Sequence, residues 1–451
     1  MMPLMKDIQV VVMMGGMGTR LGEMVATCPK PMLPVGDRPF FEYELTLLKC
    51  AGFERFLFCT GYLSSEIEDH FGDGSKYGIK ISYVRDGEND GKGKALLGTG
   101  GALIHALPYL DEDFLLVYAD SFMDIDYKEV VYRYFEAREE GASSLMSLLH
   151  NDGRYDTSNV VYKDGRLKLY DKKNLSSEME YIDYGVNMFS RSALAEYGEK
   201  ISAFHEEEGS DGIKFDLSDI QHELSVHGRL AGLIVDRRFY EIGRPESYRE
   251  FISYAEERFD KPKKAAFLDR DGVLNEIVYN EDTELLDSPM KDEELKLLPG
   301  VTDAVSRLKA LGYCIFVVTN QPAAAKGKTS LGNLFDVNKR LKALIPEIDE
   351  VFVCFHHPKG DGRCREKNLI KKCGCRKPET GLIEEACLKY RIDRERSFMA
   401  GDSYTDIQCG RAAGLKTVFL GDLKCDVCAR LEYNKPDIIA PSLAKAVGEL
   451  T

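Results

Sequence analysis

The sequence predicts an α/β protein built from two doubly wound, mostly parallel sheets that follow one another along the chain. Three observations support this fold class. The chain has 451 residues, which is too many for one hydrophobic core. Short apolar runs alternate with stretches of helical spacing in both halves. A polar stretch that contains proline, residues 260–264, separates the two series, so we expect domains over residues 1–259 and 264–451.

The first half starts with a continuous apolar run that predicts a central strand. Further strands are expected over residues 55–59, 79–84 and 114–119, in addition to this first one over residues 8–14. Helical spacing predicts helices over residues 40–50 and 64–71, a helix opened by residues 97–103, and a closing helix over residues 251–259. Ser64 is a plausible N-cap for the second of these helices.

The second half repeats the alternation. Apolar runs predict strands over residues 265–268, 313–318 and 397–400. Residues 299–311 have helical spacing, and Gly312 stands at the expected C′ position of that helix. The order of strands and helices favours a parallel sheet in this half as well.

The composition is that of a globular protein, with 44% apolar and 30% charged residues. The formal net charge of -15 argues against nucleic acid or an anionic membrane as a partner. No run of 18 apolar residues is present and the N-terminus has no secretory pattern, so we expect a cytoplasmic protein. Small phosphorylated substrates would need local cations and metal ions, and the sequence predicts no particular oligomeric state.

Clustered cysteines predict a metal site. The chain has twelve cysteines and no signal peptide, which indicates a reducing compartment where such clusters bind metal more often than they form disulfides. A Cys-x-His pair and a Cys-x-Cys pair suit a closed tetrahedral Zn²⁺ site made by Cys354, His356, Cys373 and Cys375. Cys364 or His357 could replace one of these ligands. Cys425 and Cys428 have no second pair, and we interpret them as ordinary cysteines.

Two carboxylates follow the first strand of the second half. Asp269 and Asp271 stand directly after residues 265–268, where Gly272 lets the chain turn. Residues i and i+2 leave a strand on the same side, at the end where open α/β sheets hold ligands. One carboxylate can attack phosphorus while the other gives a proton to the leaving group.

A glycine-rich turn follows the first strand of the chain. Its glycines let backbone N–H groups approach phosphate oxygens, and Arg20 can bind a phosphate bidentately. Lys30 is a second cation, held on a stiff Pro-Lys-Pro loop. The run Gly15-Gly16-Met17-Gly18-Thr19-Arg20-Leu21, followed by Pro29-Lys30-Pro31-Met32, resembles the sugar-1-phosphate nucleotidyltransferases. Met13 and Met14 stand where that family usually has Leu-Ala.

This resemblance implies a Rossmann-like domain that transfers a nucleotidyl group from an NTP to a sugar 1-phosphate and releases pyrophosphate. Arg20 and Lys30 would place the reactants. The nucleotide would bind at Gly15, Gly16, Gly18, Thr19 and Gly98. Mg²⁺ would bind Asp120 and Glu241, although the family commonly has Asp at the second position. Lys172, or its neighbour Lys173, and Asp183 would bind the sugar phosphate.

A second resemblance is to the haloacid-dehalogenase-type phosphatases. It rests on Asp-x-Asp-Gly, Thr319-Asn320-Gln321, Arg376-Lys377-Pro378 and Gly401-Asp402, in this order at predicted strand ends. The resemblance implies that Asp269 is the nucleophile and Asp271 the acid, with Thr319 and Lys377 on the phosphoryl group and Asn320 and Arg376 on the substrate. Mg²⁺ would be held by Asp269, Asp271 and Asp402, with Asp406 as a nearby acid.

The zinc pattern narrows this second resemblance to the heptose 1,7-bisphosphate phosphatases and the histidinol-phosphate phosphatases. Pro322 departs from both, because those families often have Ser or Asp there. We therefore predict a bifunctional enzyme that makes an NDP-heptose, with GTP as the expected NTP. The alternatives are another sugar phosphate, histidinol phosphate as substrate of the second half, or a first half that only senses nucleotide sugars.

Overall fold

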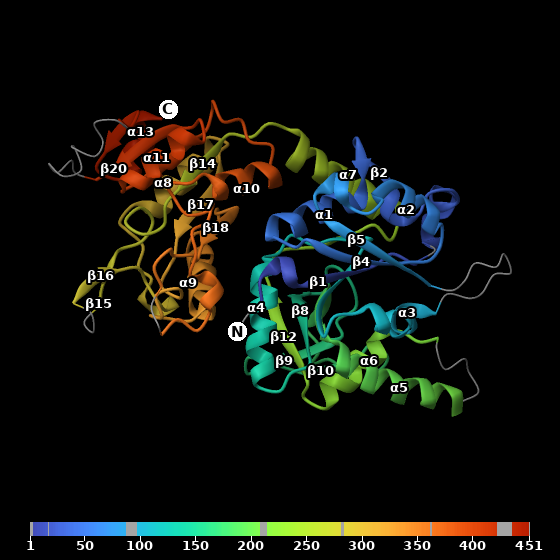
Figure 1. The fold of residues 1–451 in the computed structure, drawn as a ribbon. Helices are drawn as coiled ribbons and strands as arrows, with labels where there is room; N and C mark the ends of the chain where they lie inside the picture. The colour runs from blue at the N-terminus through green and yellow to red at the C-terminus, as the bar shows by residue number, and fades with distance from the viewer. Residues whose placement is uncertain are drawn as a thin grey trace. The chain divides into compact units, whose positions relative to one another are not determined.

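The computed structural model describes residues 3–16, 18–86, 97–207, 214–280, 284–360, 363–421 and 435–450. The chain divides into two compact units, Met2–Glu256 and Glu257–Thr451. Each unit has its own sheet covered by helices (Figure 1). The α/β fold class expected from the sequence is confirmed.

The centre of the first unit is a parallel arrangement of four strands. β1 (Gln9–Met13) lies between β4 (Arg55–Thr60) and β6 (Asp113–Tyr118), and β4 also pairs with β5 (Lys80–Arg85). Val10, Val11 and Val12 of β1 are fully buried, as the continuous apolar run predicted. All four predicted strands are therefore confirmed. Most of their ends differ from the predicted ends by one residue.

Beyond β6 the sheet becomes mixed. The long strand β11 (Tyr181–Ser190) runs antiparallel to β6 and to β8 (Ser144–His150), and β12 (Leu230–Val235) pairs in parallel with β8. β9 (Val160–Lys163) and β10 (Arg166–Tyr170) form an antiparallel pair at the edge. Two short antiparallel ribbons complete the unit, β2 (Pro34–Val35) with β3 (Arg38–Pro39) and β7 (Ser121–Phe122) with β13 (Tyr240–Glu241).

Helices cover both faces of this sheet. On one face, α1 (Phe40–Ala51) and α2 (Ser64–Phe71) bring Phe41 and Phe71 edge-on to Phe58 of β4. On the other face, the core includes side chains of α3 (Gly98–Ala106), α5 (Arg191–Glu207) and α6 (Leu217–Val226). α4 (Tyr127–Glu139) packs on β8. α7 (Pro245–Ala255) continues into a π-helical turn, Glu256–Asp260, so the predicted closing helix starts earlier than expected.

The prediction that Ser64 caps α2 is wrong. Leu63 is the N-cap residue, with a left-handed φ of 52°, and no side chain caps the helix. Because the chain enters from a left-handed residue, Ser64 is already inside the first turn. Its hydroxyl therefore does not occupy the position from which an N-cap side chain accepts backbone N–H groups.

The second unit contains a six-stranded sheet in which every neighbouring pair is parallel. The order is β18-β17-β14-β19-β20-β21. The strands are β14 (Ala265–Leu268), β17 (Cys314–Asn320), β18 (Glu350–Cys354), β19 (Phe398–Gly401), β20 (Lys416–Leu420) and β21 (Ile438–Ala440). A separate hairpin joins β15 (Val278–Asn280) to β16 (Leu285–Asp287). The three strands predicted for this half are confirmed.

Alternate residues of the central strands enter two different cores. Ala266 and Leu268 of β14 pack with α8 (Val301–Ala310), α9 (Leu331–Leu344) and α13 (Leu443–Glu449). Ala265 and Phe267 pack with α10 (Gly381–Lys389) and α11 (Tyr404–Ala412) on the opposite face. This alternation follows from the period of two along a strand. Gly312 follows α8 with a φ of 82°, as its predicted C′ position requires.

Among the described residues, no helix combines the length and the apolar character that crossing a membrane would require. The ten cysteines of the described ranges are all free of disulfides. Cys425 and Cys428 lie outside the described residues.

Candidate active sites and a candidate metal centre

The glycine-rich turn follows β1 at the carboxyl end of the sheet. Gly18 has a φ of 61°, and a Cβ built on it would lie 3.6 Å from carbons of the Lys30 side chain. The turn and the Pro-Lys-Pro loop are therefore in contact. Thr19 and Arg20 are exposed at the start of a 3₁₀ helix, Thr19–Val25. Met17 of this motif lies outside the described residues.

Lys30 reaches the two predicted metal carboxylates of the first unit. Its Nζ lies 2.6 Å from Asp120 Oδ2 and 3.8 Å from Glu241 Oε1. The ribbon of β7 and β13 explains why two distant acids meet, since Ile242 N donates to Asp120 O at 3.0 Å. Burial and the charge of Asp120 raise the pKa of Glu241, while Lys30 opposes this.

Gly98, predicted to bind the nucleotide, lies beside Phe215, and Lys172, predicted to bind the sugar phosphate, lies near the next residue, Asp216. Gly98 has a φ of 77°, and a Cβ there would lie 2.5 Å from Phe215 O, so only glycine fits this turn. Burial raises the pKa of Asp183, while Lys172 acts against the shift. Against the effect of burial, Lys172 also lowers the pKa of Asp216. The carboxylate of Asp216 caps α6. Lys173 instead forms an ion pair with Asp219, at 2.6 Å.

In the second unit, three carboxylates meet at the carboxyl end of the parallel sheet. Asp269, Asp402 and Asp406 each offer an oxygen within 4.8 Å of the others. Asp269 follows β14, and Asp402 follows the neighbouring strand β19. Lys377 joins them, with Nζ 2.8 Å from Asp269 Oδ1 and 2.6 Å from Asp406 Oδ1. Asp406 is fully buried, and its other oxygen accepts from Ser403 at the start of α11.

The local charge of this cluster is uncompensated, because one ammonium faces three carboxylates. Burial and the nearby Asp406 raise the pKa of Asp269 to about 7, although Lys377 acts in the opposite direction. The same two causes raise the pKa of Asp402 to about 6. Burial disfavours the ammonium of Lys377, yet Asp269 and Asp406 raise its pKa overall. A divalent cation would relieve this repulsion.

The carboxylate of Asp271 lies outside that group of three and has its own donors. Gln321 Nε2, Ser288 Oγ and Asn275 Nδ2 donate to it at 2.5, 2.8 and 3.0 Å. Burial raises the pKa of Asp271, but Arg270 and these hydrogen bonds together bring it below the ordinary value. Gly272 follows with a φ of 80°, and a Cβ there would lie 2.1 Å from Asp402 Oδ2.

The remaining predicted phosphatase residues line the same strand ends. Thr319 is buried at the end of β17 and accepts from Gln321 Nε2 at 2.8 Å. Asn320 accepts from Lys377 N at 3.0 Å and donates to Lys377 O at 3.2 Å, which fixes the lysine backbone. Arg376 Nη1 donates to His356 O at 3.3 Å.

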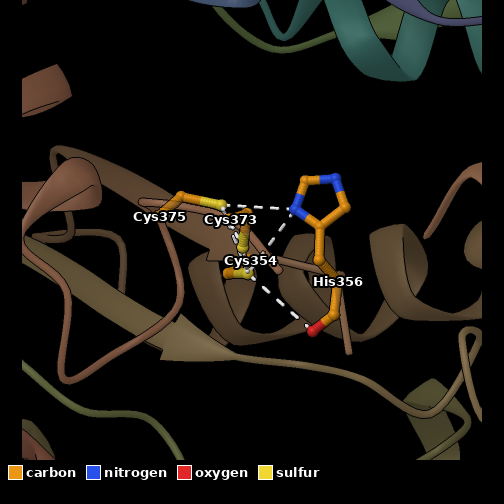
Figure 2. A group of neighbouring side chains, drawn as sticks. All are labelled: Cys354, His356, Cys373 and Cys375. Atoms are coloured by element: carbon orange, nitrogen blue, oxygen red, sulfur yellow. Dashed lines mark hydrogen bonds between the residues drawn. The ribbon is translucent and has the colours of Figure 1, made fainter. Parts of the chain in front are cut away.

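Three thiols and one imidazole converge beside the segment that carries Arg376 and Lys377 (Figure 2). Ligand atoms of Cys354, His356, Cys373 and Cys375 all lie within 4.8 Å of one another. The three Sγ–Sγ distances are 3.3, 3.4 and 3.6 Å, near the value of about 3.8 Å for two thiolates on one tetrahedral Zn²⁺. His357 bonds Lys359 O, and buried Cys364 donates to Glu366 O, so neither joins this group.

Sequence reasoning missed the residues that hold Asp271. Arg270 stands between the two predicted catalytic acids and is completely buried, and Gln321 was noted only as part of a motif. Asp216, which caps α6 near Lys172, was also not singled out. The one available signal was the polar character of Arg270 and Gln321 beside apolar strands, since buried polar groups are bonded for a reason.

Comparisons with known proteins match two different families, each within one half of the chain. The family profile described as Nucleotidyl transferase matches residues 9–258, and the profile described as HAD-hydrolase-like matches residues 374–446. A Campylobacter jejuni protein named D-glycero-alpha-D-manno-heptose 1-phosphate guanylyltransferase is 26% identical, covering 54% of this chain and 99% of the relative.

Two phosphatases are also similar to this chain. The D-glycero-beta-D-manno-heptose-1,7-bisphosphate 7-phosphatase of Haemophilus influenzae is 34% identical, covering 34% of this chain and 78% of the relative. The corresponding D-glycero-alpha enzyme of Photorhabdus laumondii is 38% identical, covering 35% of this chain and 81% of the relative.

The two folds and their two sites together define a class of protein: a bifunctional enzyme that acts on phosphate groups. The chain belongs to the nucleotidyl transferase family through its first half and to the haloacid-dehalogenase-type phosphatase family of these relatives through its second. One polypeptide therefore combines a nucleotidyltransferase with a phosphatase, and the enzyme classes predicted from the sequence are confirmed.

Proposed function

We propose that this enzyme makes a GDP-heptose in two consecutive steps. The phosphatase half, residues 264–451, removes the 7-phosphate of a heptose 1,7-bisphosphate. The nucleotidyltransferase half, residues 1–259, then transfers GMP from GTP to the resulting heptose 1-phosphate and releases pyrophosphate. The observation that carries the proposal is the presence in one chain of the Asp269–Asp402–Asp406 cluster and the Lys30–Asp120–Glu241 cluster.

In the phosphatase step, Asp269 attacks the phosphorus of the 7-phosphate. The bond between phosphorus and the sugar oxygen breaks, and Asp271 gives its proton to that oxygen. Asp271 then takes a proton from water as the water oxygen attacks the aspartyl phosphate, so inorganic phosphate leaves and both acids are restored. Lys377 and Thr319 hold the transferring group, because their side chains stand at the same strand ends.

The residues present fit Mg²⁺ in this site. Asp269, Asp402 and Asp406 offer hard oxygen atoms close together, and burial and the charge of Asp406 raise the pKa of Asp269. Asp269 and Asp402 would hold the ion, with the backbone carbonyl of Asp271. When bound, Mg²⁺ would keep Asp269 ionised and neutralise charge on the phosphate.

In the nucleotidyl step, the protein binds and orients the reactants, and no covalent intermediate is needed. Arg20 and the turn Gly15, Gly16, Gly18 and Thr19 bind the triphosphate, and Gly98 stands beside the base. The paired Lys30 places a cation on the phosphoryl oxygens. Asp120 and Glu241 would hold Mg²⁺. Lys172 and Asp183 bind the sugar phosphate, which is supported by the ion pair that keeps Lys173 on Asp219.

The thiol–imidazole group fits a structural Zn²⁺ ion held by Cys354, His356, Cys373 and Cys375. Soft thiolates and imidazole in a tetrahedral arrangement suit zinc. Cys375 is two residues from Lys377, and Arg376 donates to His356 O. The ion would therefore fix the loop that carries the two cations of the phosphatase site, with Arg376 on the substrate.

Consecutive steps require one anomer throughout. The guanylyltransferase relatives are named for an alpha 1-phosphate, and one phosphatase relative is named for the alpha bisphosphate. We therefore propose D-glycero-α-D-manno-heptose as the sugar. The product would be the corresponding GDP-heptose.

The test is a stepwise incubation of the purified chain with D-glycero-α-D-manno-heptose 1,7-bisphosphate and Mg²⁺. Inorganic phosphate should appear first, and pyrophosphate and GDP-heptose only after GTP is added. Replacing GTP by ATP, UTP or CTP tests the base, and replacing the sugar by the β anomer, a hexose bisphosphate or histidinol phosphate tests the substrate. Faster turnover of any replacement would contradict that part of the proposal.

A further inference from the structure

Arg270 forms a fork on the carboxylate of its own neighbour. Its Nε lies 3.2 Å from Asp271 Oδ1, and its Nη2 lies 3.3 Å from Asp271 Oδ2. The side chain of Arg270 is fully buried, so solvent cannot compete for these bonds. A guanidinium that bonds both oxygens defines the plane of a carboxylate as well as its position.

The fork itself is anchored from a distant helix. The third nitrogen of the guanidinium, Nη1, donates to Asn338 Oδ1 at 2.8 Å. Asn338 is on α9 and only 8% exposed, beside Val337 and Leu341, which belong to the apolar core. An amide in such a place is costly unless it is bonded, and Arg270 is the partner that its oxygen has.

The other donors to Asp271 do not supply the same constraint. Gln321 and Ser288 bond Oδ2, and Asn275 bonds Oδ1, each through a single contact. Gln321 also contacts Thr319, so its position depends on the strand that carries the phosphoryl-binding hydroxyl. Arg270 alone among these four donors contacts both oxygens of Asp271.

We infer that Arg270 and Asn338 are a positioning pair for the acid of the phosphatase step. They are not placed to contact the substrate, but Arg270, anchored by Asn338, fixes the plane and position of the Asp271 carboxyl group that serves the leaving oxygen. The inference rests on the proposed role of Asp271. Proton transfer requires donor and acceptor within about 2.6–3.2 Å, so a freely rotating carboxyl group would transfer its proton less often.

The positioning role of Arg270 and Asn338 can be tested by comparing the reaction rates of phosphate esters with different leaving groups. p-Nitrophenyl phosphate releases a stable phenolate that needs no proton, whereas glycerol 2-phosphate and heptose 1,7-bisphosphate release alkoxides that do. In Asn338→Leu we expect the rate of the first turnover of the alkyl esters, measured before the aspartyl phosphate is hydrolysed, to fall about 10–100-fold, within the range of about 10²–10⁴ that general acid catalysis supplies. For p-nitrophenyl phosphate we expect the burst of p-nitrophenolate release to change less than about threefold, since departure of the phenolate does not depend on the acid.

Two further variants complete the experiment. Asn338→Asp keeps an oxygen for Arg270 and should restore most of the activity on alkyl esters. Asn333→Leu makes the first substitution at another position of α9, where the amide bonds Thr329 and not Arg270, and should leave the ratio of the two substrates as in the wild type. The activity on p-nitrophenyl phosphate also shows that each variant is folded.

The outcomes separate this inference from the proposed function. In the first turnover, Asp271→Asn should show the same preference for p-nitrophenyl phosphate, and more strongly. If it does not, the role of Asp271 is wrong and the positioning role fails with it. If Asp271→Asn shows the preference but Asn338→Leu loses both substrates equally, or neither, then the pair is only structural and the inference is overturned.

Discussion

The two acidic clusters proposed as phosphate-handling sites differ in how cations and water offset the charges of their carboxylates. In the first unit, the side chains of Asp120 and Glu241 are 31% and 50% exposed, and Lys30 pairs with both. In the second unit, the side chains of Asp269 and Asp406 are 14% and 0% exposed, and one buried lysine serves three acids.

The difference teaches that burial decides how strongly a site depends on a divalent cation. Water and Lys30 partly screen the first pair of carboxylates, although burial and the charge of Asp120 still raise the pKa of Glu241. The second group is more deeply buried, so water screens it less, and burial together with the charge of Asp406 raises the pKa of Asp269 to about 7. We therefore expect the buried site to respond more strongly to substitution and to metal than the exposed one.

The largest expected effect breaks the buried site. Asp269→Asn removes the proposed nucleophile, and we expect phosphate release from heptose 1,7-bisphosphate to fall by about 10⁴-fold or more, as for nucleophiles elsewhere. Pyrophosphate release from GTP and added heptose 1-phosphate should continue at the wild-type rate. Phosphate release at the normal rate would show that Asp269 is not the nucleophile.

A smaller effect is expected at the exposed site. Asp120→Asn removes one carboxylate beside Lys30, and we expect pyrophosphate release to fall by about 10²–10³-fold, the size typical for one electrostatic group at a transition state. The measurement uses GTP and heptose 1-phosphate at saturating Mg²⁺, and phosphate release from the bisphosphate is the internal control. A loss of both activities together would indicate misfolding of the whole chain.

The metal centre allows a matched pair of variants that changes one half only. Cys375→Ser should lower the zinc content from about one ion per chain and reduce phosphate release, because the loop before Lys377 loses its tie. Cys364→Ser should change neither, since that thiol bonds Glu366 O. Zinc content measured by mass spectrometry, together with both activities, checks this. Equal loss of zinc in the two variants would contradict the ligand set.

The smallest effect concerns pH. In the metal-free protein, the pKa of Asp269 is raised from 3.8 to about 7, so the folded state binds more protons than the unfolded state within this window. The contribution of Asp269 to stability is therefore present below about pH 3.8 and is lost as the pH rises through 7. Because Mg²⁺ favours the ionised carboxylate, the rise in Tm that it causes should be larger at pH 8 than at pH 5.5.

Calorimetry at the two pH values, with and without Mg²⁺, measures this difference. Each kcal/mol corresponds to about 2–4 °C for a unit of this size. Asp269→Asn is the control, since the difference between the two pH values should shrink when this carboxyl group is absent. An equal effect of Mg²⁺ at both pH values in the wild type would contradict the assignment.

Much of the fold could be predicted because its strands are continuous apolar runs that end in polar motifs. β14 matches the predicted residues 265–268, and the carboxylates that follow β14 and β19 meet as the parallel sheet implies. The resemblance to known families supplied the roles of Lys377 and Thr319, which local spacing alone does not indicate. The Cys-x-His and Cys-x-Cys pairs also came together as expected.

What escaped prediction depends on contacts between distant segments. The bond between Arg270 and Asn338 joins residues 68 positions apart, and nothing in the spacing of either residue points to the other. The failed cap at Ser64 has a local cause, since Leu63 adopts a left-handed conformation that apolar residues seldom take. The mixed part of the first sheet also depends on long-range pairing of β11, which does not follow from the sequence pattern.

Gly272 shows how narrowly the two neighbouring strands limit each other. A side chain at this position would overlap Asp402 Oδ2, since even the first carbon would lie 2.1 Å from it. The carboxylate of Asp402 thus occupies the volume that a Cβ at residue 272 would need, so the two positions limit each other's size. The smallest residue of the Asp-x-Asp-Gly motif thereby sets how near the sheet can bring the carboxylate of Asp402 to that of Asp269.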